Sequence, residues 1–211
     1  MARGRFIVLE GGEGTGKSTQ SRLLSESLRA RGLEVVTTRE PGGTPGAEAI
    51  RDLLLDPKGD GWEPEAEALL FAAARSDHIA RLIRPALDRG AWVVCDRFLD
   101  SSRAYQGGGG GVEDADIVAL HQFGSHGLLP DLTILIDVPE GELAARLARR
   151  AGRETDRIEG RELAFHKRVR DAFERFAQED PDRFVTVDGS GEKEATQAQI
   201  LAAAEALMAG E

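Results

Sequence analysis

The chain has 211 residues, 41% hydrophobic and 30% charged, which suits one globular domain with a substantial core. Its net charge of −10 disfavours binding to nucleic acid polymers or anionic membranes, and no apolar run reaches the ~20 residues that cross a bilayer. A single cysteine excludes an internal disulfide, and with no secretory signal near the start we expect a cytoplasmic protein.

The first element predicted along the chain is a short apolar strand, Phe6–Glu10, followed at once by G-G-E-G-T-G-K-S at residues 11–18. This segment matches G-x-x-x-x-G-K-[ST], in which small residues let several backbone N–H groups converge on one phosphate. Lys17 would add a charge for the β- and γ-phosphates, and the Ser18 hydroxyl would bind Mg²⁺. A flexible glycine-rich turn is the alternative, but the strand before and the helix predicted over Ser18–Arg31 favour a phosphate-binding loop. The predicted ATP contacts are Gly11, Gly12, Glu13, Gly14, Thr15, Gly16, Lys17, Ser18 and Thr19.

The remaining elements alternate between strands and helices. The further predicted strands are mostly continuous in apolar residues, as in strands covered on both faces, and they span Leu33–Thr38, Trp92–Asp96, Leu132–Asp137 and Phe184–Asp188. Helical periodicity is found over Ala47–Leu55, Glu63–Arg89, Asp114–Phe123, Glu140–Arg150, Arg161–Gln178 and Glu192–Met208. Pro85 should kink or split the second of these, and the glycine run Gly107–Gly111 is interpreted as a loop. The pattern predicts a single α/β domain over residues 1–211, a three-layer fold with a five-stranded parallel sheet flanked by helices.

Polar residues follow the predicted strands where each strand ends. Ligands of such sheets bind beyond the carboxyl ends of the strands, so these residues should gather on one rim. They are Glu10, Arg39, Glu40, Asp96, Arg97 and Asp137.

Taken together, the motifs resemble those of bacterial thymidylate kinases, which belong to the nucleoside monophosphate kinases with a P-loop. The matching segments run in the family's order, at Glu10–Thr19, R-E-P-G-G-T (39–44), F-A-A-A-R (71–75), D-R-F (96–98), S-S-R-A-Y-Q-G (101–107), P-D-L (130–132) and D-R-I-E (156–159). The resemblance implies transfer of the γ-phosphate of ATP to dTMP, with Mg²⁺ as cofactor, in a homodimer. Broad apolar stripes on Glu63–Arg89 and Asp114–Phe123 give the homodimer weak independent support.

The resemblance also implies roles for the acceptor site. Arg39 and Arg97 would hold the dTMP phosphate, because guanidinium groups suit a dianion. Phe71 would stack on the thymine, Arg75 would donate to a base carbonyl, and Tyr105 would pack where a ribose 2′-hydroxyl would lie. The implied dTMP-binding set is Glu10, Arg39, Pro41, Phe71, Arg75, Arg97, Ser101, Ser102, Tyr105 and Gln106, and the implied metal ligands are Ser18, Glu10 and Asp96.

For several of these residues a structural role is the alternative. Phe71 has the spacing of a core aromatic, and Arg97 has Asp96 beside it as a candidate ion-pair partner. Glu10, Pro41 and Gln106 are each compatible with ordinary packing or a solvated loop.

A short mobile lid is expected at about residues 149–160, between two amphipathic helices. In the family that the chain resembles, a catalytic arginine comes from the phosphate-binding loop or from the lid. The variable positions of this loop contain no arginine, so the resemblance implies that the charge on the transferring phosphoryl group is met from the lid. The available donors are Arg149, Arg150 and Arg153, and which of them acts stays open. The predicted catalytic residues are therefore Lys17, Arg97, Arg149, Arg150 and Arg153.

Two other functions compete with this interpretation. A kinase for another monophosphate or for a deoxynucleoside is the nearest, and the pair Arg39 and Arg97 favours a monophosphate acceptor. A GTPase switch or a nucleic-acid-stimulated NTPase is the second, and it is disfavoured because the chain has no N-K-x-D motif and no basic patch.

Overall fold

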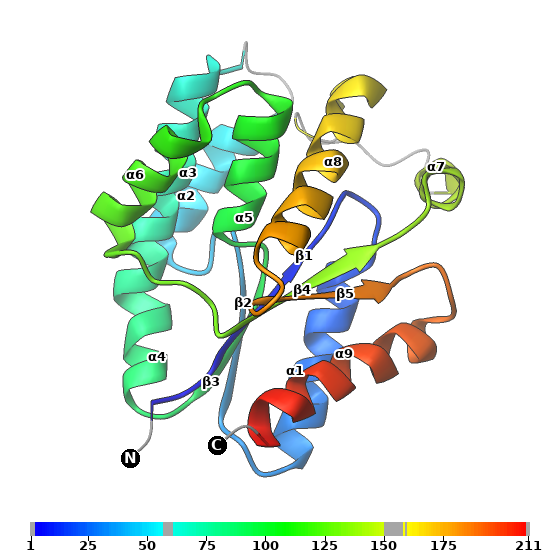
Figure 1. The fold of residues 1–211 in the computed structure, drawn as a ribbon. Coiled ribbons are helices and arrows are strands. Elements are labelled where there is room, and N and C mark those ends of the chain that lie inside the picture. Colours follow the sequence, from blue (N-terminus) through cyan, green and yellow to red (C-terminus); the bar gives the residue numbers. More distant parts are fainter. Residues whose placement is uncertain (1–2, 57–60, 150–157, 159, 210–211) are drawn as a thin grey trace.

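The structure is a computed structural model that describes residues 3–56, 61–149, 158 and 160–209. A single parallel sheet lies at the centre of the fold (Figure 1). Its five strands are β1 (Phe6–Glu10), β2 (Val35–Arg39), β3 (Trp92–Asp96), β4 (Leu132–Asp137) and β5 (Phe184–Asp188), in the order β2-β3-β1-β4-β5. Every pairing is parallel, and each residue of β1 and β3 is buried. The predicted α/β fold is confirmed, and four of the five predicted strands have the expected bounds.

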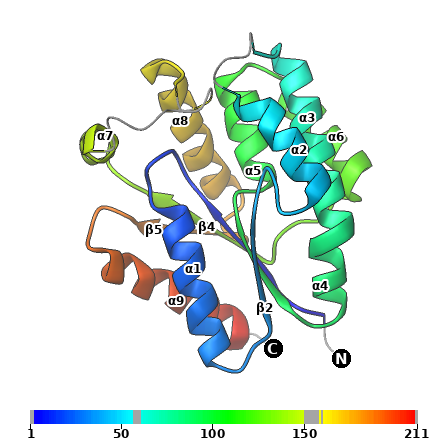
Figure 2. The same cartoon turned by 180° about the vertical axis from the view of Figure 1, so that it is seen from behind.

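Helices cover both faces of the sheet (Figures 1 and 2). Alternate residues of β1 point to opposite faces. Ile7 and Leu9 pack in a cluster with residues of α1 (Lys17–Ala30) and α9 (Lys193–Ala209), whereas Phe6 and Val8 face the other layer. The other described helices are α2 (Pro45–Leu55), α3 (Pro64–His78), α4 (Arg84–Asp88), α5 (Leu99–Ser102), α6 (Asp114–Ser125), α7 (Glu140–Arg149) and α8 (Leu163–Glu179).

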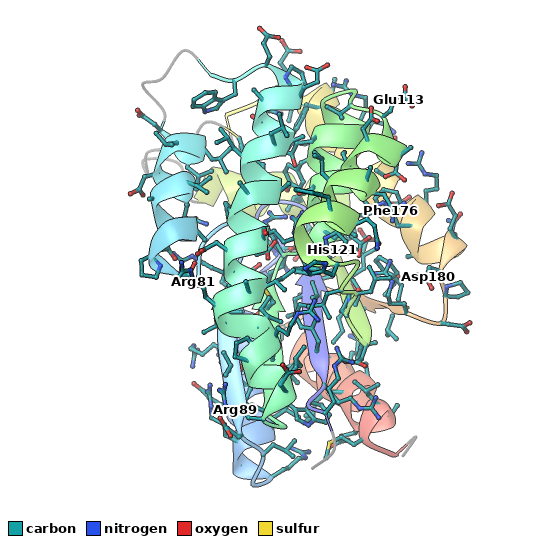
Figure 3. The ribbon with its side chains drawn as sticks, turned by 90° about the vertical axis from the view of Figure 1, so that its left-hand side faces the viewer. Arg81, Arg89, Glu113, His121, Phe176 and Asp180 are labelled. Carbon is teal, nitrogen blue, oxygen red and sulfur yellow. The ribbon has the colours of Figure 1, made fainter. Side chains whose placement is uncertain are left out.

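The long predicted helix over Glu63–Arg89 changes its winding before Pro85. After α3 the chain forms a π-helix over Ile79–Ile83, and α4 then begins with Pro85 at its second position. A proline ring disturbs the carbonyl four residues earlier, which lies in this π-helical turn. Figure 3 looks onto this layer, where the α6 residue His121 is buried with its ring edge-on to Phe98, while Arg81 and Arg89 lie outside.

The glycine run Gly107–Gly111 was predicted as a loop, and that prediction is wrong for its first three residues. Gly107, Gly108 and Gly109 end a π-helix over Arg103–Gly109 that continues α5. A side chain is excluded at Gly108 and Gly109 because α8 lies so close that a Cβ atom at Gly108 would come within 2.8 Å of the Ala172 Cβ atom. The glycines thus serve helix packing, and the sequence pattern by itself does not distinguish this use from a turn.

Among the helices of the described ranges, none combines the length and the apolar content that a membrane span requires.

Candidate active site

A cavity of about 260 Å³ opens beyond the carboxyl ends of β1, β2 and β3. It collects most of the predicted site residues, namely Glu13, Gly14, Gly16, Lys17, Ser18, Thr19, Arg39, Pro41, Phe71, Arg75, Asp96, Arg97, Ser101, Ser102, Tyr105 and Gln106. It also contains Glu40, which was expected on the rim but given no role, and residues that the sequence did not point to, namely Arg51, Leu55, Phe98 and Ile158. The expected gathering of polar strand-end residues on one rim is thereby observed for Arg39, Glu40, Asp96 and Arg97.

The loop between β1 and α1 has the geometry of an anion cradle. Gly11, Gly14 and Gly16 have positive φ angles, which only glycine adopts without cost, and α1 begins at Lys17 with no side-chain cap on its first N–H groups. The Lys17 ammonium lies inside the loop and donates to the Gly12 carbonyl at 2.7 Å. Burial, reinforced by the Arg97 charge, lowers the pKa of Lys17 to about 8. Such a buried cation next to uncapped helix N–H groups is suited to a polyphosphate.

Ser18 and Asp96 meet at the mouth of this loop. The Ser18 hydroxyl donates to Asp96 Oδ2 at 2.5 Å, and Asp96 Oδ1 is buried with no hydrogen-bond partner in the described ranges. Mg²⁺ prefers such hard oxygen donors and needs only one or two carboxylates beside phosphate oxygens and water. The two side chains therefore fit a magnesium ion.

Glu10, the third predicted metal ligand, lies behind the cavity wall and is fully buried. Its carboxylate accepts hydrogen bonds from the backbone N–H groups of Phe98 (2.8 Å) and Ser101 (3.1 Å) and from the Ser101 hydroxyl (2.6 Å). Burial raises the pKa of Glu10 to about 7. The geometry makes Glu10 an anchor for the segment that begins α5.

Arg97 and Tyr105 meet a carboxylate of the phosphate-binding loop. Arg97 has a φ angle of 70°, uncommon for a residue with a side chain, and its guanidinium forms an ion pair with Glu13. Arg97 also donates to the Gly11 carbonyl (3.0 Å), the Ser101 hydroxyl (3.1 Å) and the Tyr105 hydroxyl (3.1 Å). The Tyr105 hydroxyl donates to Glu13 at 3.0 Å.

Glu13 is therefore the ion-pair partner of Arg97, and the sequence did not predict this pairing. The alternative considered for Arg97 was an ion pair with the adjacent Asp96, but the ion pair that forms joins Arg97 to Glu13. Although burial opposes ionisation, the Arg97 and Lys17 charges lower the pKa of Glu13 to about 2. The cavity thus holds a charged carboxylate between a cation and a tyrosine.

Arg39, the second predicted phosphate ligand, lies at the cavity edge with its side chain 50% exposed. It pairs with Glu48 at 2.9 Å, and the other oxygen of Glu48 accepts from the Gly43 N–H at 2.8 Å. Arg51 donates to the Pro41 carbonyl at 2.8 Å. This edge of the cavity is rich in guanidinium groups.

Arg75 lies in the deepest part of the acceptor side and is only 3% exposed. Its Nε donates to Glu40 at 2.8 Å, and its Nη2 donates to the Phe98 carbonyl (3.1 Å) and the Ser102 hydroxyl (2.8 Å). Within the part of the chain that the structure describes, Nη1 has no hydrogen-bond partner, and Arg75 lines the cavity. One donor nitrogen of a rigidly held guanidinium is therefore available to a ligand, one helical turn from Phe71.

Gln106 and Phe71 are both held by neighbouring side chains. Gln106 is buried and donates to Glu67 at 2.9 Å, while Phe71 packs against the apolar cluster that contains Tyr105 and Phe165. Phe71 therefore combines the core role considered for it with a place on the cavity wall.

A second cavity of about 380 Å³ lies on the other side of the phosphate-binding loop. It is bounded by Gly14, Thr15, Gly16, Thr19, Gln20, Arg146, Gly189, Gly191, Lys193 and Thr196. Arg146 of α7 donates to the Gly189 carbonyl at 2.6 Å and so joins α7 to the loop after β5. The phosphate-binding loop marks one wall of this cavity in the sequence, whereas the residues on its other walls come from distant segments that no motif connects.

Comparison with known proteins identifies the family. Residues 9–200 match the family model described as thymidylate kinase. The chain is 56% identical to a thymidylate kinase of Rhizorhabdus wittichii, over 95% of this chain and 96% of the relative, and 53% identical to one of Chromohalobacter salexigens, over 96% and 95%. The solved structure of thymidylate kinase from Ehrlichia chaffeensis superimposes with a TM-score of 0.78 and 34% identity, covering 97% of this chain and 99% of that one. The chain belongs to the thymidylate kinase family.

Thymidylate kinase membership confirms the resemblance inferred from the motifs, whereas the expected lid is not placed by the structure. Arg149 is the last residue of α7, and Arg150 and Arg153 lie outside the described residues. Arg39, Arg75 and Arg97, which the family motifs single out, lie on one cavity.

Proposed function

We propose that this member of the thymidylate kinase family transfers the γ-phosphoryl group of ATP to dTMP and so forms ADP and dTDP. The observation that carries the proposal is the first cavity, in which the phosphate-binding loop, Arg97 and Arg75 lie on the walls of one space. A phosphate donor and a monophosphate acceptor bound there would face one another, as in-line transfer requires.

The donor nucleotide occupies the phosphate-binding loop and the second cavity in this proposal. The loop N–H groups and Lys17 bind the phosphates, and the cavity bounded by Arg146 and Thr196 accepts the base. Ser18 and Asp96 would hold Mg²⁺, which when bound neutralises charge on the donor phosphates. Lys17 would act mainly on charge that develops as the phosphoryl group leaves.

The acceptor lies on the side of Arg97 and Arg75. Arg97 would exchange the Glu13 carboxylate for a phosphate oxygen of dTMP, and Arg39 would bind the same phosphate from the cavity edge. Phe71 would stack on the thymine, and Arg75, with Ser102, would contact the polar edge of the base. Pro41 and Gln106 complete this pocket as wall residues.

The sugar would lie against Tyr105. Glu13, which faces the cavity and bonds to Tyr105, is better placed to meet a sugar hydroxyl than Glu10, which lies behind the wall. We assign Glu10 a positioning role, because its carboxylate holds Ser101 and the start of α5.

The chemistry needs no strong general base, because an acceptor phosphate oxygen is already ionised at neutral pH. The work of the protein is alignment and charge stabilisation. We keep Arg149, Arg150 and Arg153 as candidate donors to the transferring phosphoryl group, carried by a lid at about residues 149–160 of the single domain.

We further propose a cytoplasmic homodimer. The described part of the chain leaves large apolar side chains exposed on α3 and α6, among them Leu69, Val118 and Phe123. These belong to the stretches whose apolar stripes first indicated a second copy, and a dimer would cover such a surface. Sedimentation analysis of the purified chain would measure its oligomeric state.

A coupled ADP-release assay tests the function. ATP and Mg²⁺ are supplied with each of dTMP, dUMP, dCMP, dAMP and dGMP, and in parallel with single-stranded DNA or RNA and no monophosphate. We expect the highest kcat/KM with dTMP and no stimulation by nucleic acid. ATP turnover that ignores the monophosphate, or that rises with DNA or RNA, would contradict the proposal.

A further inference from the structure

A buried histidine, His78, lies next to Glu40, the carboxylate that holds Arg75, and no motif or proposed role includes it. His78 is the last residue of α3, three residues after Arg75, and it is fully buried. The space around its ring is closed, since a Cβ atom on Gly43 would come within 2.5 Å of its Nε2 atom. The ring is therefore held in one place by its surroundings.

The two nitrogens of this ring connect β2 to the acceptor pocket. His78 Nδ1 lies 3.0 Å from Glu40 Oε1, and Nε2 lies 2.7 Å from the Thr38 hydroxyl. The other oxygen of Glu40 accepts from Arg75 Nε at 2.8 Å. A continuous chain of hydrogen bonds thus runs from Thr38 through His78 and Glu40 to Arg75.

The chemistry of Glu40 determines the direction of these bonds. Glu40 is 5% exposed, and although burial opposes ionisation, the Arg75 charge and the His78 hydrogen bond lower its pKa. An ionised carboxylate only accepts hydrogen bonds, so His78 Nδ1 must carry the proton that it donates to Glu40. In the neutral ring Nε2 is then an acceptor, and it receives the Thr38 hydroxyl proton.

We propose that His78 is a positioning residue for base recognition, acting through Glu40 on Arg75. This inference rests on the proposed function, in which Arg75 contacts the polar edge of the base; here that contact is a donation from Arg75 Nη1 to the carbonyl at C4 of thymine. The Nδ1 proton fixes one oxygen of Glu40, so the other oxygen holds Arg75 Nε at a single angle. Nη1 is thereby directed into the cavity. Without His78 the carboxylate loses a partner in a buried site and can turn, and the guanidinium turns with it.

The selectivity that this arrangement supports is between keto and amino pyrimidines. Thymine presents an acceptor oxygen at C4, whereas cytosine presents an amino donor there. A guanidinium held at one angle donates to a carbonyl at C4 and so favours binding of thymine, whereas it has no acceptor to bind at the amino group of cytosine. A guanidinium that is free to turn discriminates less between the two bases. The measurement that reports the role of His78 is the ratio of kcat/KM for dTMP over dCMP.

Three substitutions separate positioning from mere packing. His78→Asn keeps an N–H near the Nδ1 position, His78→Gln keeps one near Nε2, and His78→Ala keeps neither. We expect His78→Ala and His78→Gln to raise the dTMP KM and to lower the dTMP/dCMP ratio by about tenfold each, the effect of about one net hydrogen bond. His78→Asn should stay within about twofold of wild type, and kcat and the ATP KM should change little in all three. His126→Asn, at an exposed position where φ is 52°, is the matched control.

The dTMP/dCMP ratios of the variants test whether His78 positions Arg75. Equal ratios in the Asn and Gln variants, or a wild-type ratio in His78→Ala, would overturn the proposal. Should one variant fail to fold, the tautomer remains measurable: ¹⁵N NMR of the wild-type enzyme should show His78 protonated at Nδ1 and bare at Nε2, and the reverse would overturn it. Failure of the proposed function looks different, since the wild-type enzyme would then not prefer dTMP at all.

Discussion

The donor and acceptor sides of the first cavity are built in different ways. On the proposed donor side, eight consecutive residues, the last two of them at the start of α1, form the phosphate-binding loop, largely through backbone N–H groups and glycine conformations. On the proposed acceptor side, Arg75 comes from α3 and Arg97 and Tyr105 from the segment after β3, and they are held by the half-buried Glu13 and the buried Glu40. The proposed phosphate site is thus a local property of the chain, whereas the proposed acceptor site depends on packing across the domain.

This difference makes the two sides respond differently to mutation. Removing a donor-side charge should affect the chemical step and leave the fold intact. Removing an acceptor-side group should change which nucleotide binds, because each group is a proposed ligand and also part of a hydrogen-bond network.

The largest effect is expected from Lys17→Ala on the donor side. In the proposed mechanism the ammonium meets charge that grows as the phosphoryl group leaves, so kcat should fall by about 10²-fold or more, corresponding to ~3 kcal/mol. Steady-state assays with saturating dTMP measure this, and circular dichroism should show an unchanged fold. Near-normal turnover of Lys17→Ala would contradict the assignment of this loop to the active site.

Arg75→Ala tests the acceptor side. It removes the proposed donor to the base from a desolvated pocket and leaves Glu40 without its cation, so the loss should be ~1–3 kcal/mol. The loss should appear in the dTMP KM, while the ATP KM stays the same. A weakened ATP KM with normal dTMP binding would show that the two sides are assigned the wrong way round.

The pH dependence of ATP capture offers a test without mutation. Because the pKa of Lys17 lies at about 8, below the ordinary 10.5, the free enzyme loses this charge as the pH rises through about 8. We expect kcat/KM for ATP to fall about tenfold for each pH unit above that value, since this parameter reports the free enzyme. At saturating ATP the bound phosphates stabilise the ammonium, so kcat should decline less. The same decline in Lys17→Ala would assign it to another group.

Tyr105→Ala tests sugar selection. The Tyr105 ring is packed among Phe165, Phe173 and the Arg97 guanidinium, so it cannot move aside for an added hydroxyl. Its removal should lower dTMP activity and shrink the ratio of kcat/KM for dTMP over its ribo analogue by about tenfold, or roughly 1.4 kcal/mol. With an unchanged ratio, Tyr105 would be a packing residue, and selection would lie elsewhere on the wall.

The smallest effect is expected on stability, from a substitution in the glycine run Gly107–Gly111. Gly108→Ala places a methyl group against Ala172 and should lower the free energy of unfolding by about 1 kcal/mol. The double variant Gly108→Ala, Ala172→Gly removes the clash and should recover part of the loss in urea unfolding. Gly141→Ala, whose Cβ would meet nothing within 4 Å, is the control. No loss in the single variant would mean that α8 can shift without cost.

Properties carried by neighbouring residues were predictable from the amino-acid sequence. The apolar runs predicted the strands, G-x-x-x-x-G-K-[ST] predicted the phosphate-binding loop, and the spaced motifs indicated the family that the comparisons show. These succeed because strand burial, a tight glycine turn and a helix start depend on a few consecutive residues.

Only the tertiary structure decided which side chains contact one another. Arg97 pairs with Glu13, 84 positions away, rather than with its neighbour Asp96, and Glu10 faces inward to Ser101, 91 positions away. The first three glycines of the run lie in a helix against which α8 packs closely, and the second cavity forms where the loop after β5 meets α7. Buried charged groups take the partner that folding brings within hydrogen-bond reach, and proximity along the chain does not determine that partner.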